Sequence, residues 1–243
     1  MAAGAWTAGD EPRTRIAAVV IAASPSPLTA ALGRLVATAD VRIGATALAG
    51  LVLHRLDGRW LDGRGLDLVV HIYDAAAALP ARPVTDLDAA DWDCACEAPI
   101  RGFISTLRAA RPLLTATKGH LVVVTPAVSL EGAAGLVALT TGAEAVRILA
   151  KSAARRWGPD GIRVNVVAAP LAVFVDATVE ASAGTRSGDA AFGSDARRTD
   201  PCLPPVASGP DAVARTVAWL AGPGSEAVTG ATIAVDGGAL MTP

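Results

Sequence analysis

The chain has 243 residues, of which 52% are hydrophobic, and its formal net charge at pH 7 is −2. This length is enough for one α/β domain with a substantial core. A nearly balanced charge without a long basic block excludes a nucleic-acid surface, and no apolar run reaches the length of a membrane span. The N-terminal sequence also lacks the basic and apolar regions of a secretory signal. We therefore expect a cytoplasmic protein.

Apolar runs alternate with helical patterns along the chain after a flexible tail at residues 1–14, and we expect residues 15–243 to form a single domain. Continuous apolar runs are typical of parallel strands that are buried on both faces. Seven strands are expected at residues 15–23, 40–46, 51–57, 66–74, 119–127, 162–169 and 231–238. Helical patterns lie between them at residues 28–39, 86–114, 140–157 and 210–222. This alternation predicts a Rossmann-like, doubly wound, mainly parallel α/β sheet.

Two segments depart from a regular alternation. Only about twenty residues separate the expected second and fourth strands, which is too few for a helix, a strand and another helix. The fold should therefore be shortened between strands 2 and 4. Residues 181–208, which are rich in Gly, Ser, Asp and Pro, predict a long loop or lid.

Three motifs carry a family resemblance: WGPDGIRVN at 157–165, PDAVARTVAWLAG at 210–222 and VTGATIAVDGG at 228–238. Together with the order of elements, they resemble the short-chain dehydrogenase/reductase family, and most of all its 3-oxoacyl-thioester reductase branch. The resemblance runs from Arg15 to Gly238. It implies a fold that binds NAD(P) at the carboxyl end of the sheet and transfers hydride with a relay of Ser, Tyr, Lys and Asn.

The relay positions hold residues that cannot transfer a proton. The family's tyrosine and lysine positions fall on Leu139 and Ala143, its serine on Pro126 and its asparagine on Pro99. The only tyrosine in the chain is Tyr73, so no Y-x-x-x-K motif exists. The resemblance therefore predicts no catalytic residues of the family's kind, although a threonine and a serine, Thr125 and Ser129, lie close to the serine position.

The expected phosphate-binding turn is also changed. In the family this turn is rich in glycine, because backbone N–H groups must approach the pyrophosphate closely. Here the turn at residues 21–28 has no glycine, Pro25 and Pro27 each lack a donor N–H, and Leu28 replaces the third glycine. We therefore predict no cofactor on this chain, with NAD(P) held only by a partner subunit. The Cys-Ala-Cys spacing and the scattered histidines likewise predict no metal site.

One interpretation is a non-catalytic subunit that assembles with an intact paralogue acting on a 3-oxoacyl or 3-hydroxyacyl thioester. The resemblance implies that long helices form one assembly face, and that the last helix and strand form another. The helix at 140–157 and the strand at 231–238 keep these elements. The assembly would be a heterodimer or a heterotetramer, and self-association as a homo-oligomer stays open.

A second interpretation belongs to another class of protein: a cyclase, dehydratase or isomerase that uses the emptied cofactor cleft. His71, Tyr73 or Asp74 would then act as acid or base, because they lie at the carboxyl end of a central strand. An open, polar cleft favours this interpretation. Side chains such as Leu28 and Leu139 filling the cleft count against it.

Overall fold

The computed structural model describes residues 18–22, 26–36, 42–45, 65–75, 78–79, 81–175, 202 and 209–241. Within these ranges, strands form one six-stranded sheet in the order β2-β1-β3-β4-β5-β6, and every neighbouring pair is parallel. The chain moves outward from β1 to β2 and then crosses back to β3. Such a reversal of direction is characteristic of doubly wound sheets. The predicted Rossmann-like, mainly parallel α/β sheet is confirmed, and the expected shortening between strands 2 and 4 falls on residues 46–64, which lie outside the described residues.

The strands agree with six of the seven expected runs. They are β1 (Ala18–Ala22), β2 (Arg42–Ala45), β3 (Leu68–Ile72), β4 (His120–Pro126), β5 (Arg163–Ala169) and β6 (Thr232–Ala234). Every residue of β1, β3 and β4 is buried, because helices cover both faces of the sheet. The strand expected at 51–57 lies outside the described residues, as do the tail and the loop at 181–208 apart from Cys202.

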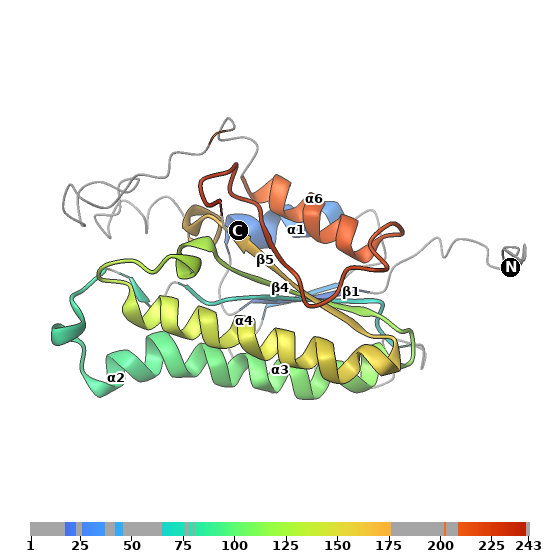
Figure 1. The fold of residues 1–243 in the computed structure, drawn as a ribbon, viewed down its shortest axis with the longest axis horizontal. Helices are drawn as coiled ribbons and strands as arrows, with labels where there is room; N and C mark the ends of the chain where they lie inside the picture. Colours follow the sequence, from blue (N-terminus) through green and yellow to red (C-terminus); the bar gives the residue numbers. More distant parts are fainter. Residues whose placement is uncertain are drawn as a thin grey trace, which may run out of the picture.

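Helices form a layer on each side of the sheet, as Figure 1 shows. One layer contains α1 (Pro27–Val36) and α6 (Pro210–Ala221), which pack against each other. The other contains the two longest described helices, α3 (Ala98–Thr115) and α4 (Val137–Trp157). Shorter pieces complete the described part: α2 (Ala89–Trp92), a π-helical turn η4 (Asp93–Glu97) and the 3₁₀ turns η3 (Val84–Asp86), η5 (Ala127–Leu130), η6 (Gly158–Asp160) and η7 (Leu171–Val173).

A buried polar network joins the elements at the edge of the sheet where β4 and β5 begin. His120 Nδ1 lies 2.7 Å from the carbonyl oxygen of Leu220 and therefore donates to it. Its Nε2 then accepts from Asn165 Nδ2 at 2.9 Å. The same amide group donates to the Val228 carbonyl at 2.8 Å and accepts from the Ala231 N–H at 3.0 Å. This network, the histidine lock, requires a neutral imidazole, because both Asn165 and His120 would otherwise present donors to each other.

Candidate functional site

The relay positions gather at the opposite edge of the sheet, where β3 and β4 end and α4 begins. Leu139 and Ala143 lie in the first two turns of α4, and both are fully buried. Pro126 ends β4, and Pro99 is a buried residue in the first turn of α3. These four side chains are packed as core residues, and none of them has a proton to exchange.

Tyr73 packs against α4 beside one of these positions, Leu139. It follows β3, is 2% exposed, and its hydroxyl donates to the carbonyl oxygens of Ala95 and Leu139, each at 3.3 Å. Burial raises the pKa of Tyr73 well above its ordinary value, and the nearby Cys96 and Asp74 raise it further. The phenol is therefore a neutral hydrogen-bond donor and is a poor general acid or base near neutral pH.

The Ala95 carbonyl is available to Tyr73 because of a proline. In an α-helix this carbonyl would accept from the N–H of residue 99, and Pro99 has none. The chain here widens into the π-helical turn η4, in which the Ala98 N–H reaches the Asp93 carbonyl. The helix expected at 86–114 is thus interrupted by a turn that was not predicted. A proline inside a helical pattern was the available signal.

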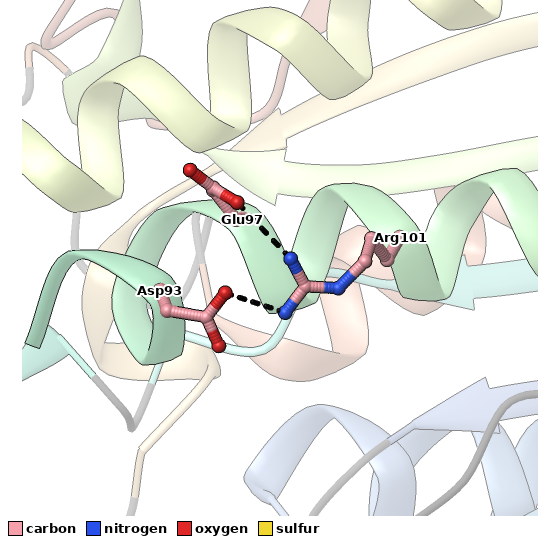
Figure 2. Close-up of polar contacts among 3 residues, drawn as sticks. All are labelled: Asp93, Glu97 and Arg101. Atoms are coloured by element: carbon pink, nitrogen blue, oxygen red, sulfur yellow. Dashed lines mark hydrogen bonds and ion pairs between the residues drawn. The ribbon is translucent and has the colours of Figure 1, made fainter. Parts of the chain in front are cut away.

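On the outer side of the same turn, an arginine joins two carboxylates. The Arg101 guanidinium donates to Asp93 Oδ1 at 2.7 Å and to Glu97 Oε2 at 3.1 Å, and Figure 2 shows these contacts. These three side chains are more than half exposed, so solvent screens the ion pairs. The turn is therefore held on its buried side by the Tyr73 hydroxyl and on its exposed side by Arg101.

The two supports should differ in their contribution to stability. We expect Arg101→Ala to leave the urea midpoint of unfolding nearly unchanged, because exposed ion pairs contribute little. Tyr73→Phe should lower the free energy of unfolding by about 1–3 kcal/mol, because it removes a buried donor from two carbonyls. Urea denaturation of both variants at neutral pH measures the difference. An equal loss in the two variants would contradict this assignment.

Gly142, on α4, makes room for the tyrosine. A Cβ atom at this position would overlap the Tyr73 hydroxyl oxygen, and it would lie 3.1 Å from the carbonyl oxygen and 3.3 Å from the Cα of Cys96. The glycine therefore permits close contact among β3, η4 and α4. No local sequence pattern indicates this role for Gly142, because its neighbours lie 46 and 69 positions earlier in the chain.

His71 does not join Tyr73 in a cluster. The Thr106 hydroxyl donates to the Gly102 carbonyl at 3.2 Å, so His71 Nδ1 donates to the Thr106 oxygen at 3.0 Å. The imidazole also contacts the Phe103 ring, with 4.9 Å between ring centroids. Burial lowers the pKa of His71 to about 4. The histidine is thus a neutral core residue beneath α3. Asp74, which directly follows Tyr73 in the sequence, is partly buried.

The two hydroxyl residues near the serine position have different surroundings. Ser129 Oγ donates to Glu144 Oε1 at 3.0 Å, and Arg147 Nε donates to the other oxygen of that carboxylate at 2.7 Å. Ser129 therefore anchors η5 to α4. Thr125 Oγ1 is buried, and no hydrogen-bond partner for it occurs among the described residues. Neither hydroxyl has a tyrosine or a lysine at the positions where the family relay would need them.

A shallow pocket lies just outside Tyr73, with about 20 Å³ of room for water-sized molecules. Its lining combines apolar side chains such as Leu136 and Leu139 with the ion pair of Arg82 and Asp91, at 2.6 Å. This volume holds about one water molecule. Leu28 and Leu139 are both fully buried, so at these positions side chains fill the space. Among the described residues, this outcome counts against a substrate cleft.

The described part of the expected phosphate turn uses its amides internally. Ser26 Oγ accepts from the Thr29 N–H at 3.2 Å, and Thr29 Oγ1 accepts from the Ser26 N–H at 2.8 Å. Pro27 has no N–H, and the Ala30 N–H is bonded to the Ser26 carbonyl at 3.2 Å. Among these residues, the turn does not fit a pyrophosphate in the way that a glycine-rich turn does. Residues 23–25 lie outside the described ranges.

Other kinds of site have little support in the part of the chain that the structure describes. There, no three His, Cys, Asp or Glu side chains come close enough to hold a metal ion. Cys94, Cys96 and Cys202 are free thiols. No described helix is both long enough and apolar enough to cross a bilayer.

Comparison with known proteins agrees with the family resemblance over most of the chain. Residues 16–240 match a family described as enoyl-(acyl carrier protein) reductase. The chain is 31% identical over 177 residues to cis-4-hydroxycyclohexanecarboxylate dehydrogenase of Sinomonas cyclohexanicum, covering 70% of this chain and 65% of that protein. It is also 31% identical over 170 residues to (+)-cis,trans-nepetalactol synthase of Nepeta racemosa, covering 67% of this chain and 59% of the relative. The matched segments thus span less than two thirds of these relatives' length.

These relatives overturn the prediction that the chain takes no cofactor. Dehydrogenases depend on a cofactor for hydride transfer, so the relatives point to a nicotinamide cofactor here as well. The prediction was wrong because it rested chiefly on the turn at 21–28. Loss of glycine there removes one set of backbone donors, and it leaves the remainder of a dinucleotide site untested.

A solved structure gives an independent comparison of the fold. An oxidoreductase of Burkholderia thailandensis, described as a short-chain dehydrogenase/reductase, superposes with a TM-score of 0.68 at 19% identity, and the match covers 93% of each chain. At this identity the likeness concerns the fold alone. The match of residues 16–240 and the sequence relatives add the family relationship. The chain belongs to the short-chain dehydrogenase/reductase family.

Proposed function

We propose that this chain is a non-catalytic subunit that assembles with an intact paralogue and supports its reaction on a 3-oxoacyl or 3-hydroxyacyl thioester. The observation that carries the proposal is the packing of Tyr73 against Leu139 and Gly142, which fills the place of the proton relay. A nicotinamide cofactor supplies hydride when bound. None of the side chains at the four relay positions could supply the matching proton.

The family match supports the proposed substrate class. The matching family is described by an acyl carrier protein substrate, in which the acyl group is carried as a thioester.

This chain keeps the family's C-terminal pattern through Asp236, whose carboxylate accepts from the N–H groups of Gly238 at 3.0 Å and Leu240 at 2.9 Å. A preserved C-terminal turn beside replaced relay positions supports a role in assembly more than a role in chemistry.

Exposed apolar side chains on both helix layers support the presence of a partner. Ile148 on α4 is 55% exposed and Trp219 on α6 is 46% exposed, and the two helices lie on opposite faces of the sheet (Figure 1). Single exposed apolar residues are common, so these positions matter here because they lie on the helices that the family uses for assembly. A related subunit would present similar helices to them.

Co-expression with an intact family member tests the proposal. We expect the two chains to co-purify, and the partner's thioester reductase activity to rise several-fold with this subunit. Ile148→Asp should abolish co-purification, because it places a charge on the assembly face. Val84→Asp is a matched control, since Val84 is 58% exposed on η3, away from α4 and α6. A partner that is fully active alone and never co-purifies would refute the proposal.

The alternative of a cyclase, dehydratase or isomerase has one observation in its favour, the similarity to a nepetalactol synthase. Its candidate residues are poorly placed for such chemistry. Tyr73 and His71 are buried and hydrogen-bonded to separate helices, and burial shifts the pKa of each away from neutrality. A pure homo-oligomer that converts an unsaturated or aldehyde substrate without a partner would favour this alternative.

A further inference from the structure

We infer that Tyr73 acts as an intramolecular ligand: its phenol ring occupies the inner half of a cavity whose outer half is the shallow pocket beside Leu139. Removing the ring should open a binding site for a small neutral phenol. The inference rests on the proposed function in one respect, namely that the reaction cleft of this chain is closed. It concerns what closes the cleft, and it does not depend on any partner.

The position of the hydroxyl group connects the ring to the pocket. The two carbonyls that accept from Tyr73 belong to Ala95 and Leu139, and both residues also line the pocket. The tip of the tyrosine therefore lies directly behind the pocket wall. Because Gly142 has no Cβ, the hydroxyl can reach this point from the end of β3. Loss of the ring would join the inner space to the pocket outside.

The chemistry of the inner space defines what it can bind. Two carbonyl oxygens converge on one hydroxyl, so the tip of the space requires a donor. Burial raises the pKa of Tyr73, which means that the surroundings disfavour a phenolate. A planar ring with one neutral donor satisfies both conditions. A benzene ring would leave the two carbonyls without a donor. A carboxylate would place its negative charge beside the partial negative charges of the two carbonyl oxygens.

The test uses Tyr73→Ala in the full-length chain, with phenol as the probe. We expect millimolar phenol to raise the thermal midpoint of this variant and to leave that of the wild type unchanged. Benzene should stabilise the variant at least ten-fold less strongly at equal concentration, and 4-hydroxybenzoate should have no effect. If the variant is insoluble, adding phenol during expression should restore soluble protein, and no restoration would overturn the inference.

Phe103→Ala supplies a matched control. Phe103 is also a fully buried aromatic residue, and its ring contacts His71. Its side chain has no hydroxyl, so the space it leaves should take benzene at least as well as phenol. Equal binding of phenol to wild type and Tyr73→Ala, or a preference of Tyr73→Ala for benzene, would overturn the inference. Neither result bears on co-purification with a paralogue, so the two proposals can fail separately.

Discussion

Gly142→Ala should destabilise this chain strongly, and Tyr73→Phe in the same molecule should recover part of the loss. The added methyl group overlaps the Tyr73 hydroxyl and crowds the Cys96 backbone at 3.1 Å. Overpacking of a core typically costs about 1–3 kcal/mol. Removing the hydroxyl relieves the closest contact and leaves the contact with Cys96, so the recovery should be incomplete.

A double-mutant cycle measured by urea denaturation isolates this coupling. The four forms are wild type, Gly142→Ala, Tyr73→Phe and the double variant, and we expect a coupling of about 0.5–3 kcal/mol. Gly158→Ala is the control, because it lies at the end of the same helix with φ −52° and nothing within 4 Å of an added Cβ. That substitution should be neutral or slightly stabilising. Strictly additive effects of the first two substitutions would show that they do not touch.

The free energy of unfolding should fall as the pH drops below about 6.5, and the histidine lock should cause much of the fall. Burial, with the Arg163 guanidinium next in importance, lowers the pKa of His120 to about 3. At a pH between this lowered pKa and the ordinary pKa of 6.5, the His120 imidazole is protonated in the unfolded chain and neutral in the folded chain. Stability is therefore complete above about pH 6.5 and is lost progressively as the pH falls toward about 3.

His120→Gln tests this assignment. We expect the variant to be less stable than wild type at pH 7, because it disturbs the bonds to Leu220 and Asn165. The difference should shrink at lower pH, since only the wild type has an imidazole at this position whose pKa is lowered by folding. His71 titrates in the same direction and remains in both proteins. Unfolding measured between about pH 5 and 7 avoids most carboxyl titration, including that of Glu226. Parallel curves for the two proteins would exclude His120 as the source.

The fold could be predicted from the sequence because its strongest determinant is local. Buried parallel strands are continuous apolar runs, such as the one that became β4, and helices with small residues fill the intervals. Leu139 and Ala143 could also be recognised as replacements, since the spacing from the GPDGIRVN motif places them. Such patterns depend on residues that are close together in the sequence, and the strands and helices that they predict occur in the structure.

The arrangement around Tyr73 could not be predicted in the same way. The sequence places His71 and Tyr73 at the carboxyl end of a central strand, but it does not tell which helices they meet. The Tyr73 hydroxyl bonds to residues 22 and 66 positions away, so these contacts depend on tertiary packing. The cofactor prediction failed for a related reason, because the short turn at 21–28 stands for only part of a dinucleotide site.

The π-helical turn η4 also has a consequence for how related chains are compared. Such a turn contains one residue more than the α-helical turn it replaces, and each residue rotates a helix by about 100°. Positions 89–92 therefore face a different direction than an unbroken helix leading into α3 would give them. Upstream of the turn, an alignment that passes through Asp93–Glu97 without a gap pairs positions whose side chains point about 100° apart around the helix axis. A single-residue gap placed inside the turn restores the correspondence.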